Sequence, residues 1–321
     1  RCGNGFIQLT NRANLQLRGI RSEAVGPLVA GLTAAGLVDP ALTAAAEARL
    51  NLLVDPFWMK AEGIWSHLDT PALWRLMRDA RAAPDAPALP GKFGFAIDLG
   101  PRVRHLHNES ADIRVETAWD DLIVRADGAS SGRRVADVAA AAALAIGMAR
   151  WFVASGGVGP DGRGRMRDHL ARGAVLPQGL SGDAQPSPPA RREGLPALVT
   201  PAFGQIAATT LRRLALCVAG DLRVTPWRAF HLPQMPNPAS LRRVGGLILD
   251  RDDPRLRAAA CTGAPGCAQA QGATHALAER LAPGLGPGQT LHVSGCAKGC
   301  AHPGTASVTL VALAPGRYGL V

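Results

Sequence analysis

The sequence is poor in aromatic residues and cysteines and has no long apolar run, and each scarcity excludes a class of protein. Aromatic side chains make up 4% of the 321 residues, too few for the stacking platforms that bind single-stranded nucleic acids. The most apolar run, residues 138–149, is well short of the roughly 20 residues that span a membrane, and we predict a buried helix there. Six cysteines in so long a chain are not the dense framework of a small disulfide-bonded secreted domain.

The net charge of +10 would suit a nucleic-acid partner, but the distribution of the charge does not. The arginines are scattered in ones and twos, and no basic stripe is present. We therefore expect some cations to face a small polyanionic ligand, and neither nucleic acid nor a membrane to be a partner. The composition is that of a globular protein of about two domains. No signal peptide is recognisable, so the expected location is the cytoplasm, although Arg1 is not a start methionine.

Four of the six cysteines form two close pairs, Cys261 with Cys267 and Cys296 with Cys300. The surrounding residues are rich in glycine and alanine, which let a backbone wrap closely around sulfur ligands. Four converging thiolates predict a 4Fe–4S cluster. A structural zinc ion is the alternative, but its cysteine pairs are usually closer in sequence than the five residues that separate Cys261 from Cys267. Two disulfides are a third possibility, which a chain large enough to bury a core does not need.

The chain contains an internal repeat. Residues 5–17 align with residues 220–232 at a constant offset of 215. In both copies an alternating, strand-like stretch ends in a threonine, Thr10 or Thr225, and is followed by a polar turn and a second extended stretch. Two such halves predict a pseudo-twofold protein with its site between them. The strand and helix expected before the second copy have no counterpart before the first, so we expect the natural chain to begin further upstream.

Hydrophobic periodicity and capping signals predict a mixture of helices and sheets. Helices are expected over 23–37, 43–49, 70–82 and 135–155, and strands over 50–54, 92–99 and 112–117. Residues 177–196 are polar and proline-rich, which predicts a linker. Residues 157–162 match the dinucleotide-binding fingerprint literally, but they follow a helix instead of a strand. We interpret them as a loop that ends the helix.

Besides the cysteines, two segments resemble the sulfite and nitrite reductases, which carry a 4Fe–4S cluster beside sirohaem. They are the strand and turn of residues 10–19 and the segment 89–93. The resemblance covers nearly the whole chain and implies an α+β, pseudo-twofold fold of two ferredoxin-like half-domains and two mixed α/β domains. The implied parts are a half-domain at 1–40, truncated at its start, an α/β domain at 41–176, the linker at 177–196, a second half-domain at 197–240, and a cluster-bearing α/β domain at 241–321, truncated at its end.

Two departures from the reductases indicate the branch of this superfamily. Leu50 stands where the reductases have an arginine, and Gly94 stands where they have a second lysine two residues after Lys92. Two cations that would bind sirohaem carboxylates and the oxyanion are therefore missing. Residues 292–303 and 92–96 instead resemble the precorrin-3B synthases of aerobic cobalamin biosynthesis.

That resemblance implies an oxidoreductase, a monooxygenase that uses O2 to hydroxylate precorrin-3A at C20 while an acetate side chain closes a lactone. The implied cofactors are the 4Fe–4S cluster and a mononuclear non-haem iron. NADH would be the indirect electron source, through a separate reductase. Sirohaem belongs only to the alternative, a sulfite or nitrite reductase. A non-enzymatic alternative is an electron-transfer or zinc-stabilised binding module.

The resemblance also implies the residues of the site. Arg12, Lys92 and Lys298 are the expected catalytic cations. The expected substrate contacts are Asn14, Gln16 and Arg18. Guanidinium and ammonium groups of this kind suit a tetrapyrrole that carries many carboxylates.

Histidines supply the remaining candidates. His105 and His107 form the only His-x-His in the chain, and a strand would point both imidazoles to one face. We therefore predict them as ligands of the second iron, although an exposed loop would look the same. His302, close to Cys300, is expected to form hydrogen bonds that tune the cluster.

Overall fold

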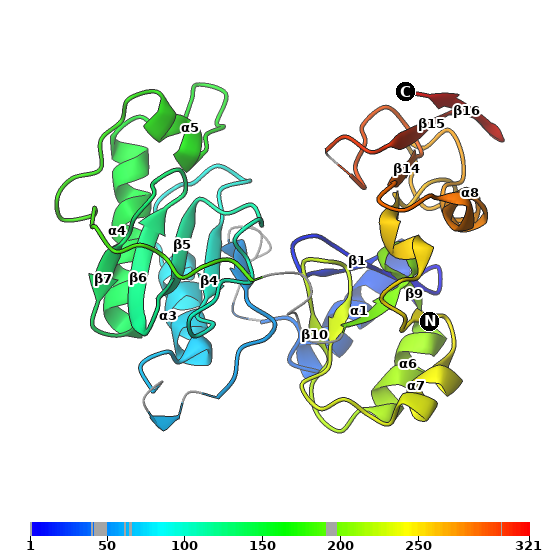
Figure 1. The fold of residues 1–321 in the computed structure, drawn as a ribbon, viewed down its shortest axis with the longest axis horizontal. Coiled ribbons are helices and arrows are strands. Elements are labelled where there is room, and N and C mark those ends of the chain that lie inside the picture. The colour runs from blue at the N-terminus through cyan, green and yellow to red at the C-terminus, as the bar shows by residue number, and fades with distance from the viewer. Residues whose placement is uncertain are drawn as a thin grey trace. The chain divides into compact units, whose positions relative to one another are not determined.

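The computed structural model describes residues 2–39, 41, 50–60, 62–63, 66–190, 198–302 and 304–321. The helix expected over 43–49 lies outside the described residues. Two compact units divide the chain, one formed by Arg1–Ala34 with Ala197–Val321 and the other by Ala35–Pro196. Both units contain sheets and helices (Figure 1), and the expected α+β class with mixed sheets is confirmed.

The first unit contains two small sheets built around the repeat. One sheet has the order β2-β1-β9, with β1 (Phe6–Leu9), β2 (Leu15–Leu17) and β9 (Gln205–Ala207). The other has the order β10-β11-β8-β12, with β10 (Arg223–Val224), β11 (Phe230–His231), β8 (Leu198–Pro201) and β12 (Leu247–Ile248). Three helices accompany them, α1 (Ser22–Ala34), α6 (Ala208–Cys217) and α7 (Pro238–Val244). One apolar core, which includes Leu9, Ile206 and Phe230, joins both sheets.

The two copies of the repeat form the same turn. The N–H of Ala13 donates to the carbonyl of Thr10 at 3.1 Å, and the N–H of Arg228 donates to the carbonyl of Thr225 at 3.2 Å. Ala13 and Arg228 both adopt the left-handed conformation, with φ of 55° and 56°. Because each pair is 215 residues apart, the alignment found in the sequence is confirmed by the backbone.

The cysteines belong to a third sheet in the same unit, with the order β13-β14-β15-β16. Its strands are β13 (Ala258–Ala260), β14 (Leu291–Ser294), β15 (Val308–Ala314) and β16 (Arg317–Leu320). The first three are parallel and the last is antiparallel. Helix α8 (His275–Leu281) packs on β13 and β14, and Phe203, Ala260 and Val293 lie in the buried core between them.

The second unit is a five-stranded sheet covered by two helices. The strands, in spatial order, are β3 (Leu52–Val54), β4 (Phe95–Asp98), β5 (Ile113–Ala118), β6 (Asp121–Ala126) and β7 (Arg133–Val135). The first three are parallel and the rest antiparallel. Helices α3 (Thr70–Ala82) and α4 (Val138–Ala154) contact each other and pack on one face of the sheet (Figure 1).

Side-chain caps fix the first residues of α3 and α4, whose bounds can be compared with the predicted ones. The side chain of Asp69 accepts from Ala72 N–H at 2.9 Å, and α3 has the predicted bounds. Asp137 accepts from Ala140 N–H at 2.8 Å, so α4 begins at Val138, three residues later than predicted. Residues 157–162 form the expected loop after α4. Sequence patterns did not reveal β6, β7 or the short helix α5 (Met166–Ala171).

Part of the predicted linker belongs to the second unit. Ser187 is fully buried, and its hydroxyl accepts from the N–H of Trp119 at 2.8 Å. The backbones of Gly132 and Ala184 exchange hydrogen bonds. Residues 177–190 therefore pack along the sheet because their polar groups find partners there. No described helix is long and apolar enough to cross a membrane.

Candidate functional site

The four paired cysteines lie in two loops that leave the same edge of the third sheet. Cys261 follows β13 directly, and Cys296 lies two residues after the end of β14. The two strands are parallel neighbours, with Ala260 opposite Val293, so their carboxyl ends lie side by side. All four cysteines are free thiols; only Cys300 is exposed.

Close backbone contacts hold the two cysteine loops together. The N–H of Gly295 donates to Cys261 Sγ at 3.1 Å, and the carbonyl of Gly295 accepts from Gln271 N–H at 2.7 Å. A Cβ added to Gly295 would lie 2.9 Å from the Cβ of Ala270 and 3.4 Å from Cys261 Sγ. Glycine is therefore required for the approach of the loops.

The arrangement of the four thiols differs from that of a site for a single zinc ion. Zinc binds cysteine sulfurs at about 2.3 Å, which brings its ligands close to one another. In the described part of the chain, no three of these thiols lie within 4.8 Å of one another. Four thiols on glycine-rich loops, with a backbone N–H aimed at one sulfur, are instead the donor set of an iron–sulfur cluster.

Two histidines lie beside the second cysteine loop. The rings of His292 and His302 are 5.9 Å apart in an edge-to-face arrangement, and the Nε2 of His302 is 3.2 Å from the carbonyl oxygen of Thr305. Burial lowers the pKa of His292, and the charges of His302 and Arg228 lower it further. The lowered pKa favours the neutral form of His292, whose ring lies beneath the second cysteine loop close to Gly299.

The four predicted residues of the first repeat lie in one hairpin. Asn14, Gln16 and Arg18 alternate along β2 and its flanks, so they share a face. The Arg18 Nη2 donates to Gln16 Oε1 at 3.1 Å, while its Nε is buried without a partner among the described residues. Thr10 Oγ1 accepts from the backbone N–H of Arg12 at 3.2 Å.

Lys92 lies exposed in the turn before β4. This turn is closed by the N–H of Phe93, which donates to Pro90 O at 2.8 Å, so β4 begins later than the predicted strand. The side chain of Asn51 donates to the carbonyl of Phe93 at 2.6 Å. Lys298 is exposed between Cys296 and Cys300, in the other unit.

Asp112 and Arg165 form a contact beside Gly94 that no sequence pattern predicted. The carboxylate of Asp112 is 1% exposed and accepts from Gly94 N–H at 3.0 Å and from Arg165 Nε at 2.9 Å. A guanidinium and the backbone of Gly94 thus share one carboxylate. No sequence signal joins the two residues, which are 53 positions apart.

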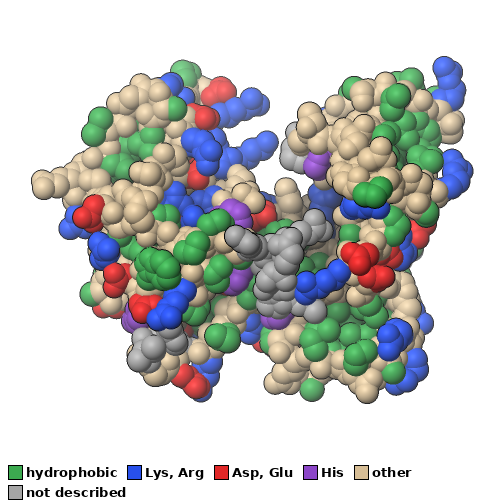
Figure 2. Space-filling view, in the orientation of Figure 1, with side chains coloured by type: hydrophobic (Ala, Val, Ile, Leu, Met, Phe, Trp, Pro, Cys, Tyr) green, Lys and Arg blue, Asp and Glu red, His purple; other side chains and the backbone are tan. Residues whose placement is uncertain are grey.

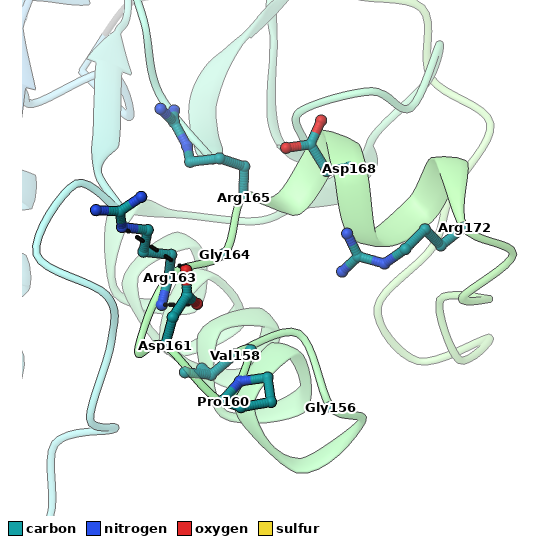
Figure 3. Close-up of a pocket in the computed structure, with 10 residues that line it drawn as sticks. Gly156, Val158, Pro160, Asp161, Arg163, Gly164, Arg165, Asp168 and Arg172 are labelled. Atoms are coloured by element: carbon teal, nitrogen blue, oxygen red, sulfur yellow. Dashed lines mark hydrogen bonds and ion pairs between the residues drawn. The ribbon is translucent and has the colours of Figure 1, made fainter.

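A cationic cavity lies next to Arg165. Its volume is about 530 Å³, and Arg163, Arg165 and Arg172 line it with Asp161 and Asp168. The guanidinium groups of Arg163 and Arg165 point to the same side of the chain (Figure 3). Basic side chains gather beside α5 on the surface (Figure 2). Arg163 is paired with Asp161 and Arg165 with Asp112, which leaves a lining with one more cation than carboxylates.

His105 lies with two buried carboxylates that the sequence analysis did not select. Its Nδ1 is 2.9 Å from Asp55 Oδ2 and 3.9 Å from Asp98 Oδ1. The three side chains are the one group among the described residues whose spacing could hold a metal ion. His107 is not part of the group, and its Nδ1 is buried without a partner among the described residues.

The pKa values of Asp98 and His105 are both raised. Burial, together with the charge of Asp55, raises the pKa of Asp98 to about 7. Burial would lower the pKa of His105, but its hydrogen bond to Asp55 and the charge of that residue raise it overall. Asp55 follows β3 and Asp98 is the last residue of β4, whereas Lys92 precedes β4, so the group and Lys92 lie toward opposite ends of that strand.

Known proteins are similar to this chain over all or part of its length. No protein-family model matches the chain. A precorrin-3B synthase from Sinorhizobium sp. is 32% identical over 351 residues, an alignment that covers 100% of this chain and 73% of that protein. The sulfite reductase [NADPH] hemoprotein beta-component of Shewanella woodyi is 33% identical over 137 residues, which cover 36% of this chain and 23% of that protein.

The solved structure of the NirA protein of Mycobacterium tuberculosis has the same fold. Its TM-score is 0.63 at 18% identity, over 96% of this chain and 66% of that one. The chain thus spans about two thirds of that structure. From the identity with the Sinorhizobium protein over the full chain, this chain belongs to the precorrin-3B synthase family of the sulfite and nitrite reductase superfamily.

Proposed function

We propose that this chain is an oxidoreductase that converts precorrin-3A to precorrin-3B in aerobic cobalamin biosynthesis. One atom of O2 would enter the substrate at C20 and the other would leave as water, with two electrons and two protons supplied. The acetate side chain would close the lactone. The observation that carries the proposal is the pair of cysteine loops at one sheet edge, found in a chain that aligns along its whole length with a precorrin-3B synthase.

The cationic side chains support a polycarboxylate substrate. Arg18 has a buried Nε without a partner among the described residues, which a substrate carboxylate would satisfy. Lys92 and Lys298 are exposed and could contact substrate without first breaking a buried ion pair. Arg12, Lys92 and Lys298 would bind and orient the reacting part of the tetrapyrrole, and Asn14, Gln16 and Arg18 would hold its periphery. Arg165 adds a cation near Gly94.

The cluster would supply one-electron transfer when bound. Cys261, Cys267, Cys296 and Cys300 would be its ligands, and Gly295 N–H would stabilise charge on Cys261. Electrons would come indirectly from NADH through a separate reductase. The exposed position of Cys300 gives that partner an approach to the cluster.

A second iron, if present, would be held by His105 with Asp55 and Asp98. One imidazole and two carboxylates are hard, oxygen-rich ligands for a divalent ion, though not the expected pair of histidines with one carboxylate. The test is the iron in excess of acid-labile sulfide in H105A and H107A variants. Loss of the surplus iron in H105A alone supports this ligand set, and loss in H107A alone contradicts it.

The proposed activity is tested on anaerobically purified full-length protein. Iron, sulfide and extractable tetrapyrrole are counted, and turnover of precorrin-3A is followed under 18O2 by mass spectrometry. A cluster without sirohaem, together with a product that carries one 18O atom, is the expected result. Stoichiometric sirohaem with reduction of sulfite or nitrite would instead support the alternative reductase.

A further inference from the structure

One face of the sheet β2-β1-β9 carries a row of three amides. Gln8 of β1 lies opposite Gln16 of β2 on one side and opposite Gln205 of β9 on the other. Directly opposed residues of antiparallel strands point to the same face of a sheet. Gln16 is a predicted substrate contact, so the face that carries it continues across β1 to Gln205, which no sequence pattern selected.

Gln8, in the middle of the row, has a buried acceptor without a donor. The residue is 9% exposed, and its Nε2 donates to the carbonyl of Phe203 at 3.1 Å. Its Oε1 is buried and has no partner within the described ranges. Because a carbonyl can only accept, the amide cannot be turned round to satisfy that oxygen. Most buried polar atoms are paired, so this one indicates a donor from outside the chain.

Thr10 adds a hydroxyl to the same face. It follows Gln8 by two residues, so the two side chains point the same way. The Oγ1 of Thr10 accepts from the N–H of Arg12 at 3.2 Å and from the N–H of Asn14 at 3.1 Å. These two bonds fill the acceptor positions of the hydroxyl. Its O–H donates to no residue that the structure describes, and is therefore available to a ligand.

The second copy of the repeat shows that the turn does not require a free O–H. Its threonine, Thr225, is 0% exposed. The hydroxyl of Thr225 donates to the carbonyl of Ala229 at 3.0 Å and accepts from the N–H of the same residue at 3.3 Å. Thr10 is half-buried, and its donor is open. The same turn thus has a satisfied hydroxyl in one copy and an unsatisfied one in the other.

We propose that this face is one binding surface for the tetrapyrrole, to which Thr10, Gln8 and Gln205 add contacts beyond the predicted ones. The inference rests on the proposed substrate, whose carboxylates accept hydrogen bonds and whose ring N–H groups donate them. The hydroxyl of Thr10 and the amide of Gln205 donate to carboxylates, and the Oε1 of Gln8 accepts from a ring N–H. The strands β1, β2 and β9 contain no acidic residue, so no carboxylate on them competes with the ligand.

The test is equilibrium binding of precorrin-3A to full-length protein without O2, followed by the absorbance of the tetrapyrrole. We expect T10V to weaken binding about tenfold, because it removes a hydrogen bond to a charged group, and Q205A about threefold. T10S keeps the hydroxyl and should bind like the wild type. T225V makes the same substitution in the turn of the second copy, where the hydroxyl is satisfied internally, and is the matched control for damage to the turn. Its Kd should stay within about twofold of the wild type.

The outcomes separate this inference from the proposed function. A wild-type protein that does not bind precorrin-3A would overturn both. Wild-type binding with an unchanged Kd in folded T10V and Q205A would overturn the inference alone. An equal loss of affinity in T10V and T225V would show that the turn matters and the hydroxyl does not, which would also overturn it. Weaker binding in T10V and Q205A, with T10S and T225V unchanged, would support it.

Discussion

The backbone N–H of Gly295 donates to the Sγ of Cys261 at 3.1 Å, and this bond joins the two loops that carry the four cysteines. A second bond, from the N–H of Gln271 to the carbonyl of Gly295 at 2.7 Å, joins the same loops. Backbone groups of Gly295 therefore help to set the relative position of the cysteine pairs, together with the hydrogen bond from Cys261 N–H to the carbonyl of Val293 at 3.3 Å. N–H groups aimed at cluster sulfurs also favour the reduced state.

Replacement of Gly295 by alanine should disrupt the cluster site. The new Cβ would lie 2.9 Å from Ala270 Cβ and 3.2 Å from Gly263 Cα, and neither is the end of a flexible side chain. We expect less than half of the wild-type iron and sulfide per chain and a loss of about 1–3 kcal/mol of stability. G284A is the matched control, because nothing lies within 4 Å of its new Cβ. Wild-type iron content in G295A would contradict the prediction.

Substitution of a ligand cysteine should have a different signature from substitution of Cys217. C261S removes one thiolate of the proposed cluster, and we expect its visible absorbance and paramagnetic signal to be lost or strongly altered. Cys217 packs against the apolar core that contains Leu214, so C217S should cost about 1 kcal/mol of stability and keep the cluster. Equal cluster content in the two variants would remove Cys261 from the ligand set.

The cysteine site and the repeat could be predicted because each leaves a local mark in the sequence. Cys261 and Cys267 are close in the chain, as are Cys296 and Cys300, and the residues between the members of each pair suit a ligand loop. The hydrogen bonds of the repeat turn join residues close in sequence, so Thr10 and Thr225 indicate the turn. The two turns match in φ to within a degree.

The remaining site residues could not be predicted because tertiary packing alone brings them together. Asp55 and His105 are 50 positions apart, and they meet because β3 and β4 are parallel neighbours. His107 was selected from its spacing to His105, but a strand at these positions, which the spacing argument assumed, does not form.

Asp112→Asn should destabilise the second unit and displace Arg165. The buried carboxylate accepts from Gly94 N–H, from Met166 N–H at 2.8 Å and from Arg165 Nε. An amide supplies only one acceptor oxygen and no charge, so we expect a loss of about 3–5 kcal/mol. Urea unfolding followed by tryptophan fluorescence measures it, since five of the six tryptophans lie in this unit. D161N, at an exposed site, should change stability by less than about 0.5 kcal/mol. A similar midpoint for D112N and D161N would refute the prediction.

The contribution of Asp127 to stability should disappear in acid. Its carboxylate accepts from Arg114 Nε at 3.2 Å and from Arg167 Nε at 3.1 Å. Burial raises its pKa, but the hydrogen bond from Arg167 and the charges of both arginines outweigh burial, so the pKa is lowered from its usual value. The folded protein then binds fewer protons than the unfolded chain between the two pKa values. Stability from this carboxylate is therefore fully present above the unfolded pKa of about 3.9 and is lost as the pH falls through the folded value.

Comparison of the wild type with D127N tests this sign directly. The introduced amide carries no charge at any pH, and the substitution leaves the buried Arg114 without its carboxylate partner. We expect D127N to lower the free energy of unfolding by about 3 kcal/mol above pH 5. Below the unfolded pKa the difference should shrink, because wild-type Asp127 becomes protonated as well. Urea unfolding at half-unit steps from pH 3 to pH 7 gives both curves, and D161N corrects for the general effect of losing an acidic residue. A difference that stays constant down to pH 3, or that grows in acid, would mean that the two arginines do not stabilise the ionised carboxylate.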